Sequence, residues 1–134
     1  LVGVSTLDVI AYQHRQAPSP LCAVVGAGRG RCYAGFYERR RGRLWLPRDY
    51  AVLTIDELAG NLADLERPAY VCGELDTDLV MTLRERLGER ARIASPASTI
   101  RRPAYLAELA LDRLVHDGAA DPTTLQPLYL RRTR

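Results

Sequence analysis

Hydrophobic and polar positions in the first part of the chain predict one helix followed by a group of strands. The segment TLDVIAYQHR (6–15) places apolar side chains on one face of a helix, and Ser5 to Asp8 has the spacing of a capping box at its start. After Pro20, apolar or alternating runs of strand length are separated by glycine-containing turns. The predicted strands cover residues 21–25, 32–39 and 43–46, and the third has a possible continuation at 50–53.

The pattern changes in the second half, where helical periods alternate with short apolar runs. Thr54 to Glu57 has the spacing of another capping box, Asp76 is placed to cap the next helix, and Pro103 and Gly118 bracket the last one. The predicted helices cover residues 55–65, 77–87 and 103–117, the strands between them cover 69–73 and 91–95, and 121–132 is extended.

This order of elements predicts an α/β fold. One helix, three antiparallel strands and then an αβαβα series is the pattern of a ribonuclease-H-like lobe, a mixed five-stranded sheet with helices on its faces. At 134 residues, the chain is expected to form one such domain over 1–134. Apolar residues make up 47% of the chain and charged residues 26%, as in soluble proteins, and no apolar run reaches membrane-spanning length.

The residue types present narrow the chemistry. All 19 basic residues are arginine, so the phosphate-binding lysine of Walker-type loops and Schiff-base chemistry are both excluded. Only two histidines occur, which excludes a three-histidine zinc site. The three cysteines, at positions 22, 32 and 72, lie far apart and indicate reduced thiols in a cytoplasmic protein.

Candidate catalytic groups are few. The strand at 21–25 lacks the carboxylates with which ribonuclease-H-like nucleases hold magnesium, and the G-x-S-x-G motif of serine hydrolases does not occur. Glu108, Asp112 and His116 share one face of the last helix, and we interpret them as a solvated surface. The sequence therefore predicts no catalytic residue, no metal site and no cofactor.

A basic stretch at residues 26–43, GAGRGRCYAGFYERRRGR, contains six arginines and five glycines. Its G-x-G-x-G start is not a dinucleotide-binding loop, because strand-like residues follow it where such a loop needs a helix, so we expect a hairpin turn. Strand alternation places Tyr33 and Tyr37 on one face and Phe36 on the other. An RNA-binding module is an alternative function, with candidate contacts at Arg29, Arg31, Arg39, Arg40 and Arg41.

Three segments, in order, resemble the C-terminal half of the TsaB family of tRNA threonylcarbamoyladenosine biosynthesis. Val2–Leu7 (VGVSTL) resembles the family's GVSSL, Val24–Tyr37 resembles V-I-D-A-R-R-G-E-V-Y-x-A-x-Y, and Pro127–Arg131 resembles the closing P-x-Y-L-R. The matching residues are Ala27, Arg29, Gly30, Tyr33 and Tyr37 in the hairpin, then Pro127, Tyr129, Leu130 and Arg131. The chain departs from the family pattern at Gly26, where an Asp is usual, at Gly28 and at Arg31.

The resemblance implies a lobe of the actin-like, sugar-kinase and Hsp70-like ATPase fold that has lost ATP chemistry. It further implies a non-catalytic scaffold in the formation of N6-threonylcarbamoyladenosine at adenosine 37 of tRNA. Such a scaffold supports a TsaD-type catalytic subunit together with a TsaE-type ATPase, and tRNA is an indirect partner. Relatives have also been labelled glycoprotease-like (O-sialoglycoprotein endopeptidase), so a glycoprotease-like or ATPase enzyme of the same fold is the alternative.

The resemblance also carries expectations about the rest of the molecule. The family has an N-terminal lobe that would precede Leu1, so we expect this chain to be the C-terminal half of a longer two-lobe protein located in the cytoplasm. A surface that the missing lobe would cover, including the Ser5–Arg15 helix, is then expected to be exposed and to promote self-association, with a homodimer as one outcome.

Overall fold

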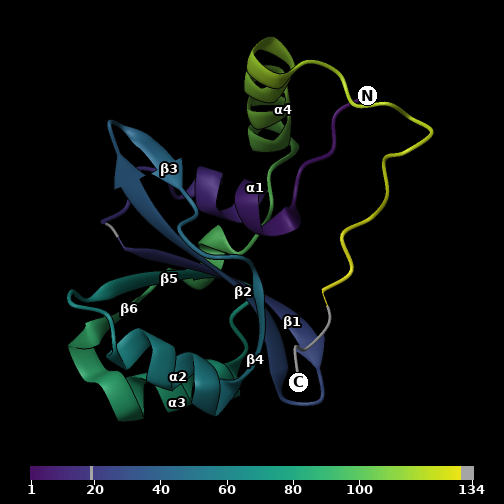
Figure 1. The fold of residues 1–134 in the computed structure, drawn as a ribbon. Coiled ribbons are helices and arrows are strands. Elements are labelled where there is room, and N and C mark those ends of the chain that lie inside the picture. The colour runs from purple at the N-terminus through teal and green to yellow at the C-terminus, as the bar shows by residue number, and fades with distance from the viewer. Residues whose placement is uncertain (19, 131–134) are drawn as a thin grey trace.

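The computed structural model describes residues 1–18 and 20–130, and a mixed β-sheet forms its centre (Figure 1). The strands are β1 (Leu21–Gly28), β2 (Arg31–Arg40), β3 (Arg43–Trp45), β4 (Ala51–Thr54), β5 (Ala69–Gly73) and β6 (Ala91–Ile93). Their order is β3-β2-β1-β5-β6, with β4 also paired to β2. β1 runs antiparallel to β2 and parallel to β5, and β5 runs parallel to β6.

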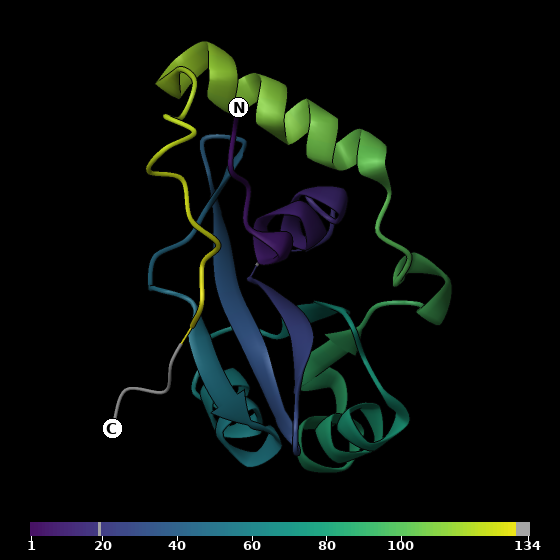
Figure 2. The same cartoon turned by 90° about the vertical axis from the view of Figure 1, so that its right-hand side faces the viewer.

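Helices cover both faces of this sheet. Within the described residues the α-helices are α1 (Thr6–Gln13), α2 (Ile55–Ala63), α3 (Thr77–Leu87) and α4 (Pro103–Asp117). α2 and α3 lie on one face and α1 lies on the other, and α4 forms an outer layer beyond α1 (Figure 2). No helix in this part of the chain has both the length and the apolar character needed to cross a membrane.

Two Arg-Gly dipeptides form the hairpin turns of the sheet. Arg29 and Gly30 connect β1 to β2 with φ angles of 53° and 68°, and Arg41 and Gly42 connect β2 to β3 with φ angles of 48° and 80°. Positive φ at both central residues is the mark of a type I′ turn, which matches the twist of the flanking strands. The prediction that GAGRGR is the turn between the first two strands is therefore confirmed.

β3 and β4 are two segments of one sheet edge. β3 pairs with Glu38–Arg40 at one end of β2, and β4 pairs with Arg31–Ala34 at the other end. Pro47 lies in the interruption and has no N–H group with which to continue the ladder. The predicted third strand and its continuation are both present, so the sheet has six strands where the sequence predicted five.

Alternation along β2 sends side chains into two separate cores, as predicted. Cys32 and Phe36 point to the face covered by α2 and α3. Tyr33 and Tyr37 point to the opposite face, where Tyr37 packs among residues of α1. The first core is built around Cys22, Val24, Leu58, Leu62, Val71, Leu79 and Leu83, and the second around Leu7, Ile10, Ala11, Leu21, Ala23 and Cys72.

The expectation of an exposed Ser5–Arg15 helix is wrong. The predicted apolar face of this helix packs on β1 and β5, and its residues Leu7, Ile10 and Ala11 are at most 4% exposed. α4 covers the other side of α1 (Figure 2). The helix is buried because its own sheet and α4 both cover it, so its surface is not available for self-association.

Most helices begin at the capping residues that the sequence predicted. Thr54 and Glu57 form the predicted capping box, Asp76 accepts from the backbone N–H of Leu79, and Pro103 begins α4. The capping box predicted at Ser5 is wrong, because the Ser5 side chain makes no cap hydrogen bond there. The side chain of Asp8, the other half of that predicted box, has different partners.

Candidate functional site

A largely buried carboxylate lies where α1, the sheet and α4 meet. Oδ1 of Asp8 accepts a hydrogen bond from the hydroxyl of Tyr37 at 2.8 Å and another from the hydroxyl of Tyr50 at 2.6 Å. Oδ2 of Asp8 forms an ion pair with Nη2 of Arg113. The Asp8 side chain is only 13% exposed, so these groups replace most of the water around it. One carboxylate therefore joins α1, β2, the segment before β4, and α4.

The two tyrosine hydroxyls are held in their donor form. Burial, with the hydrogen bond to Asp8 as a second cause, raises the pKa of Tyr50 to about 12. Burial and the neighbouring Asp8 raise the pKa of Tyr37 still further. Both hydroxyls therefore keep their protons at neutral pH and continue to donate to the carboxylate.

Arg113 also holds the start of the chain in place. Its Nη1 donates to the carbonyl oxygen of Gly3 at 3.2 Å. The backbone N–H of Ala120 donates to the carbonyl oxygen of Leu1 at 2.8 Å, and the side chain of Leu125 lies against Gly3. The residues before α1 are thus clamped between α4 and the segment that follows it.

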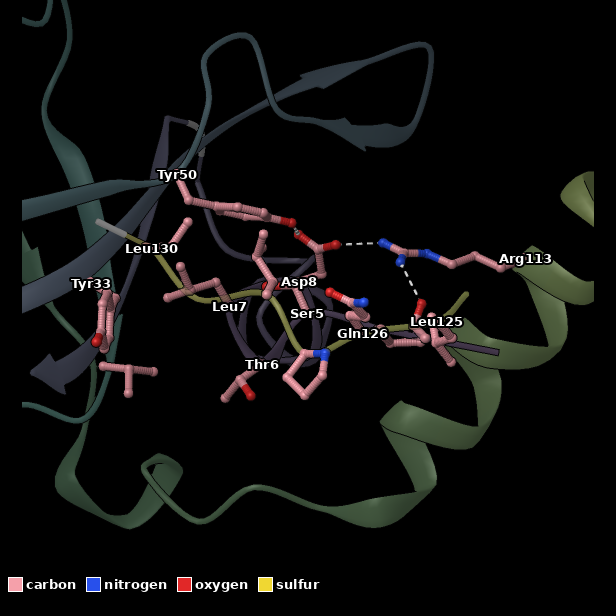
Figure 3. Close-up of a pocket in the computed structure, with 15 residues that line it drawn as sticks. Ser5, Thr6, Leu7, Asp8, Tyr33, Tyr50, Arg113, Leu125, Gln126 and Leu130 are labelled. Atoms are coloured by element: carbon pink, nitrogen blue, oxygen red, sulfur yellow. Dashed lines mark hydrogen bonds and ion pairs between the residues drawn. The ribbon is translucent and has the colours of Figure 1, made fainter. Parts of the chain in front are cut away.

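An open pocket of about 830 Å³ lies beside the Asp8 cluster (Figure 3). The N-terminal end of α1 forms one wall, and residues 125–130 form another. Tyr33 and Tyr50 contribute ring surface, while Ser5, Thr6 and Gln126 contribute polar groups. Figure 3 shows Asp8 between Tyr50 and Arg113 at the edge of this space. The lining is mainly apolar with a few polar groups, which suits a docked chain segment or small ligand.

A second groove, of about 910 Å³, separates the β2–β3 hairpin from α4. Arg43 forms an ion pair of 2.6 Å with Asp112, and Arg15 forms one of 3.4 Å with Glu108. Nδ1 of His116 donates to the backbone carbonyl oxygen of Asp112 at 2.8 Å within the same helix. The face of Glu108, Asp112 and His116, which the sequence suggested was simply solvated, therefore contributes two ion pairs to neighbouring elements, because α4 turns it toward α1 and the hairpin.

The Asp8 carboxylate is engaged by neighbouring side chains. Asp8 is already bonded to Tyr37, Tyr50 and Arg113, so no lone carboxylate faces the pocket at that point. Across residues 1–18 and 20–130, no group of three or more His, Cys, Asp or Glu side chains is placed to hold a metal ion. What the Asp8 cluster does is fix four chain segments relative to one another.

The candidate RNA contacts do not form one surface. Arg29 and Arg31 lie at one end of β2, and Arg39 to Arg41 lie at the other, roughly 30 Å away for ten residues at ~3.3 Å each. Arg39 donates to the carbonyl oxygens of Arg15 and Ala17, and the Arg40 guanidinium stacks on Trp45 at 3.5 Å. The candidate arginines therefore lie in two groups at the two ends of β2, and their contact with RNA stays a prediction.

The aromatic residues of the same stretch are also unavailable as a base-stacking platform. Tyr37 is 4% exposed and bonded to Asp8, and Phe36 packs against the core beneath α2 and α3. Tyr33 lines the pocket beside the Asp8 cluster, and Tyr37 lines the groove between the β2–β3 hairpin and α4. A stacking role would need exposed ring faces, which Phe36 and Tyr37 lack.

Comparison with known proteins finds a curated relative along nearly the whole chain. No protein-family model matches the chain. The tRNA threonylcarbamoyladenosine biosynthesis protein TsaB of Bacillus subtilis (strain 168) is 32% identical to it over 131 residues, which cover 96% of this chain and 55% of that protein. The chain is similar to TsaB over nearly its whole length. It spans about half the length of the curated relative that it matches.

Two solved structures from Pseudomonas aeruginosa support the TsaB-family fold. An uncharacterized protein with similarity to the peptidase YeaZ has a TM-score of 0.71 and 23% identity, covering 96% of this chain and 57% of that one. YeaZ itself has a TM-score of 0.66 and 20% identity, covering 95% and 57%. The predicted fold class, a ribonuclease-H-like lobe with a mixed sheet, is confirmed.

The TsaB-family motif residues gather at two places. Ala27, Arg29 and Gly30 lie at or beside the β1–β2 turn, away from the pocket. The other motif residues lie at or near the pocket: Tyr33, Pro127 and Leu130 line it, Tyr37 bonds Asp8, Tyr129 is 81% exposed, and Arg131 lies outside the described residues. Parts of the hairpin and closing motifs, nearly a hundred residues apart, thus line one cavity.

Sequence reasoning missed the residues that organise this cavity. Tyr50 and Arg113 carry no local motif, and Asp8 was interpreted as part of a helix cap. Their side chains meet only after the sheet and α4 have packed on α1. An Asp on the otherwise apolar side of a short helix was the one available signal, because buried carboxylates need partners.

Gly26, where the TsaB pattern usually has an Asp, lies beside the carboxylate of another residue. The backbone N–H of Gly26 donates to Oε2 of Glu74 at 3.1 Å, and Oε1 of Glu74 pairs with Arg101 at 3.2 Å. A Cβ added to Gly26 would lie 3.6 Å from Oε2 of Glu74. A carboxylate from the end of β5 therefore occupies the surroundings in which the TsaB-like pattern places an Asp.

We expect Gly26→Asp to destabilise the protein by about 1 kcal/mol, because the new carboxylate would lie beside that of Glu74. The effect should shrink in 1 M salt, which screens exposed charges, and should nearly vanish in a Glu74→Gln background. Gly26→Asn, which has the same size without the charge, is the matched control. Urea denaturation of Gly26→Asp, Gly26→Asn, Glu74→Gln and the Gly26→Asp, Glu74→Gln double variant measures the coupling between the two carboxylates. Equal losses of unfolding free energy for Gly26→Asp and Gly26→Asn would contradict the repulsion.

Proposed function

We propose that this chain acts as a non-catalytic scaffold in the biosynthesis of tRNA threonylcarbamoyladenosine. The observation that carries the proposal is the 32% identity, over 96% of the chain, to a protein of that pathway. The arrangement of the motif residues supports it, because the hairpin and closing segments of the TsaB pattern line one pocket around Tyr33, Pro127 and Leu130.

The scaffold role follows from what the cluster around Asp8 does. The Asp8 carboxylate bonds Tyr37, Tyr50 and Arg113 from three different chain segments, which is the behaviour of a structural group. Its proposed protein partners are a TsaD-type catalytic subunit and a TsaE-type ATPase. We further propose that tRNA is an indirect partner and that the protein acts in the cytoplasm. Residues 1–134 would then form the C-terminal lobe of a two-lobe protein.

The test uses bacterial cells depleted of their own TsaB-family protein. We expect that expressing the gene encoding this chain restores N6-threonylcarbamoyladenosine in their tRNA, measured by mass spectrometry of nucleosides. The purified chain should show no ATP hydrolysis and no proteolysis above background. An unrestored nucleoside level with well-folded protein would overturn the proposed pathway. Activity that disappears on changing Glu108, Asp112 or His116 would instead favour an enzyme.

A further inference from the structure

Charged side chains hold the outermost helix, α4, against the body of the molecule (Figure 2). A helix on the surface of a globular protein is normally held by an apolar face that is turned toward the core. In α4, acidic and basic side chains take this place. The ion pairs that join α4 to the rest of the molecule are Asp112 with Arg43, Glu108 with Arg15, and Arg113 with Asp8.

Apolar burial contributes little to the docking of α4. None of its residues is buried, and neither of the two apolar cores includes a member of this helix. Leu111 is 62% exposed and Val115 is 71% exposed, whereas Leu58 of α2 and Leu83 of α3 have no exposed surface. Removal of apolar surface from water is the main force that holds a helix on a domain, and exposed ion pairs add little to it. α4 is therefore held more weakly than α2 or α3.

We propose that α4 is a lid, which opens as one unit while the sheet and the other helices stay folded. The contacts at its two ends suit hinges. Before the lid, the Gln13 side chain of α1 donates to the carbonyl oxygen of Ser98 at 2.9 Å and accepts from the N–H of Arg102 at 3.2 Å. After it, Gly118 ends the helix with a φ angle of 82°, which glycine adopts easily. Rotation of a few residues at these ends is sufficient to move the lid.

Opening changes the groove of about 910 Å³ between α4 and the β2–β3 hairpin. In the closed state Arg15 and Arg43 are paired with carboxylates of α4, and the ring of Tyr12 meets that of Tyr105 with 6.3 Å between centroids. Without α4, the charged groups left in the lining of the groove are Arg15, Arg40, Arg43 and Asp8. The lid therefore covers a groove with an excess of positive charge and neutralises two of its guanidinium groups. This inference is independent of the proposed tRNA function.

Hydrogen–deuterium exchange of the backbone amides in the 134-residue chain tests the lid. After correction for intrinsic rates, the amides of α4 should exchange at least ~100-fold faster than those of β1, because a local opening requires less free energy than global unfolding. An isolated helix of 15 residues is marginal in water, so α4 loses its hydrogen bonds as it opens and the opening becomes visible to exchange. Exchange of α4 as slow as that of β1 would overturn the inference.

Variants of the ion pairs test what holds the lid closed. Glu108→Gln combined with Asp112→Asn removes two exposed ion pairs that exist only in the closed state, and should speed the exchange of α4 about fivefold. Asp56→Asn is the matched control, because it removes the 2.7 Å ion pair with Arg86 that joins α2 to α3. That pair stays intact while only α4 is open, so this variant should leave the exchange of α4 unchanged.

Salt gives an independent measurement on the unmodified chain. Raising the salt concentration from ~0.05 to ~1 M should speed the exchange of α4 relative to β1, because salt screens exposed ion pairs, and should do so less in the double variant. Unchanged exchange of α4 in the double variant would overturn the inference, since the ion pairs would then not hold the lid. Equal acceleration of α4 by Asp56→Asn would overturn it as well, because α4 would then open only with the whole molecule.

Discussion

Replacing Asp8 by Ala should lower the free energy of unfolding by about 3 kcal/mol. The change removes the acceptor of two tyrosine hydroxyls and leaves the Arg113 guanidinium, 31% exposed, without its carboxylate. Because domains of this size are stable by only ~5–15 kcal/mol, the midpoint of urea unfolding should fall markedly. The residues before α1 should loosen as well, since Arg113 also holds the carbonyl of Gly3.

Two further variants separate the parts of the Asp8 cluster. Asp8→Asn keeps an oxygen acceptor for Tyr37 and Tyr50 but loses the charge that pairs with Arg113, so it should cost about half as much as Asp8→Ala. Tyr37→Phe removes a single donor and should cost about 1 kcal/mol. If Asp8→Ala lowered the free energy of unfolding by less than ~0.5 kcal/mol, as an ordinary surface substitution does, the carboxylate would not hold these chain segments together.

Replacing Gly73 by Ala should destabilise the protein by about 4 kcal/mol or more. Gly73 has a φ angle of 111°, which side-chain-bearing residues rarely adopt, and a Cβ there would lie 2.1 Å from the carbonyl oxygen of Val24. Gly73 pairs with Val24 where β1 and β5 run parallel, so the clash involves backbone on both sides and no side chain can move to relieve it. Thermal unfolding followed by circular dichroism should show a large fall in the melting temperature.

Gly60→Ala is the matched control for Gly73→Ala. Gly60 lies within α2, and a Cβ there would meet nothing within 4 Å. Because alanine favours a helix interior by about 1 kcal/mol over glycine, this variant should be neutral or more stable. Similar melting temperatures for the two variants would mean that the close approach of β1 and β5 tolerates a side chain.

The sequence by itself determined the order and the local ends of the elements. The period-two pattern of β2 correctly placed Tyr33 and Tyr37 on the face opposite Phe36. The Arg-Gly dipeptides marked the hairpin turns, and Thr54 and Asp76 marked helix starts. These features depend on residues within a few positions of one another, so backbone preference, capping and periodicity are sufficient to predict them.

Only the tertiary structure decided which side chains meet. Asp8 has the spacing of a helix cap but bonds Tyr50 and Arg113, 42 and 105 residues away, because packing of α4 and the sheet surrounds it. The same packing turned the charged face of α4 inward and left Leu111 outside. The two groups of arginines in the basic stretch lie at opposite ends of β2. Contacts between distant segments depend on how layers stack, and a local pattern carries no information about which of its faces the rest of the chain will cover.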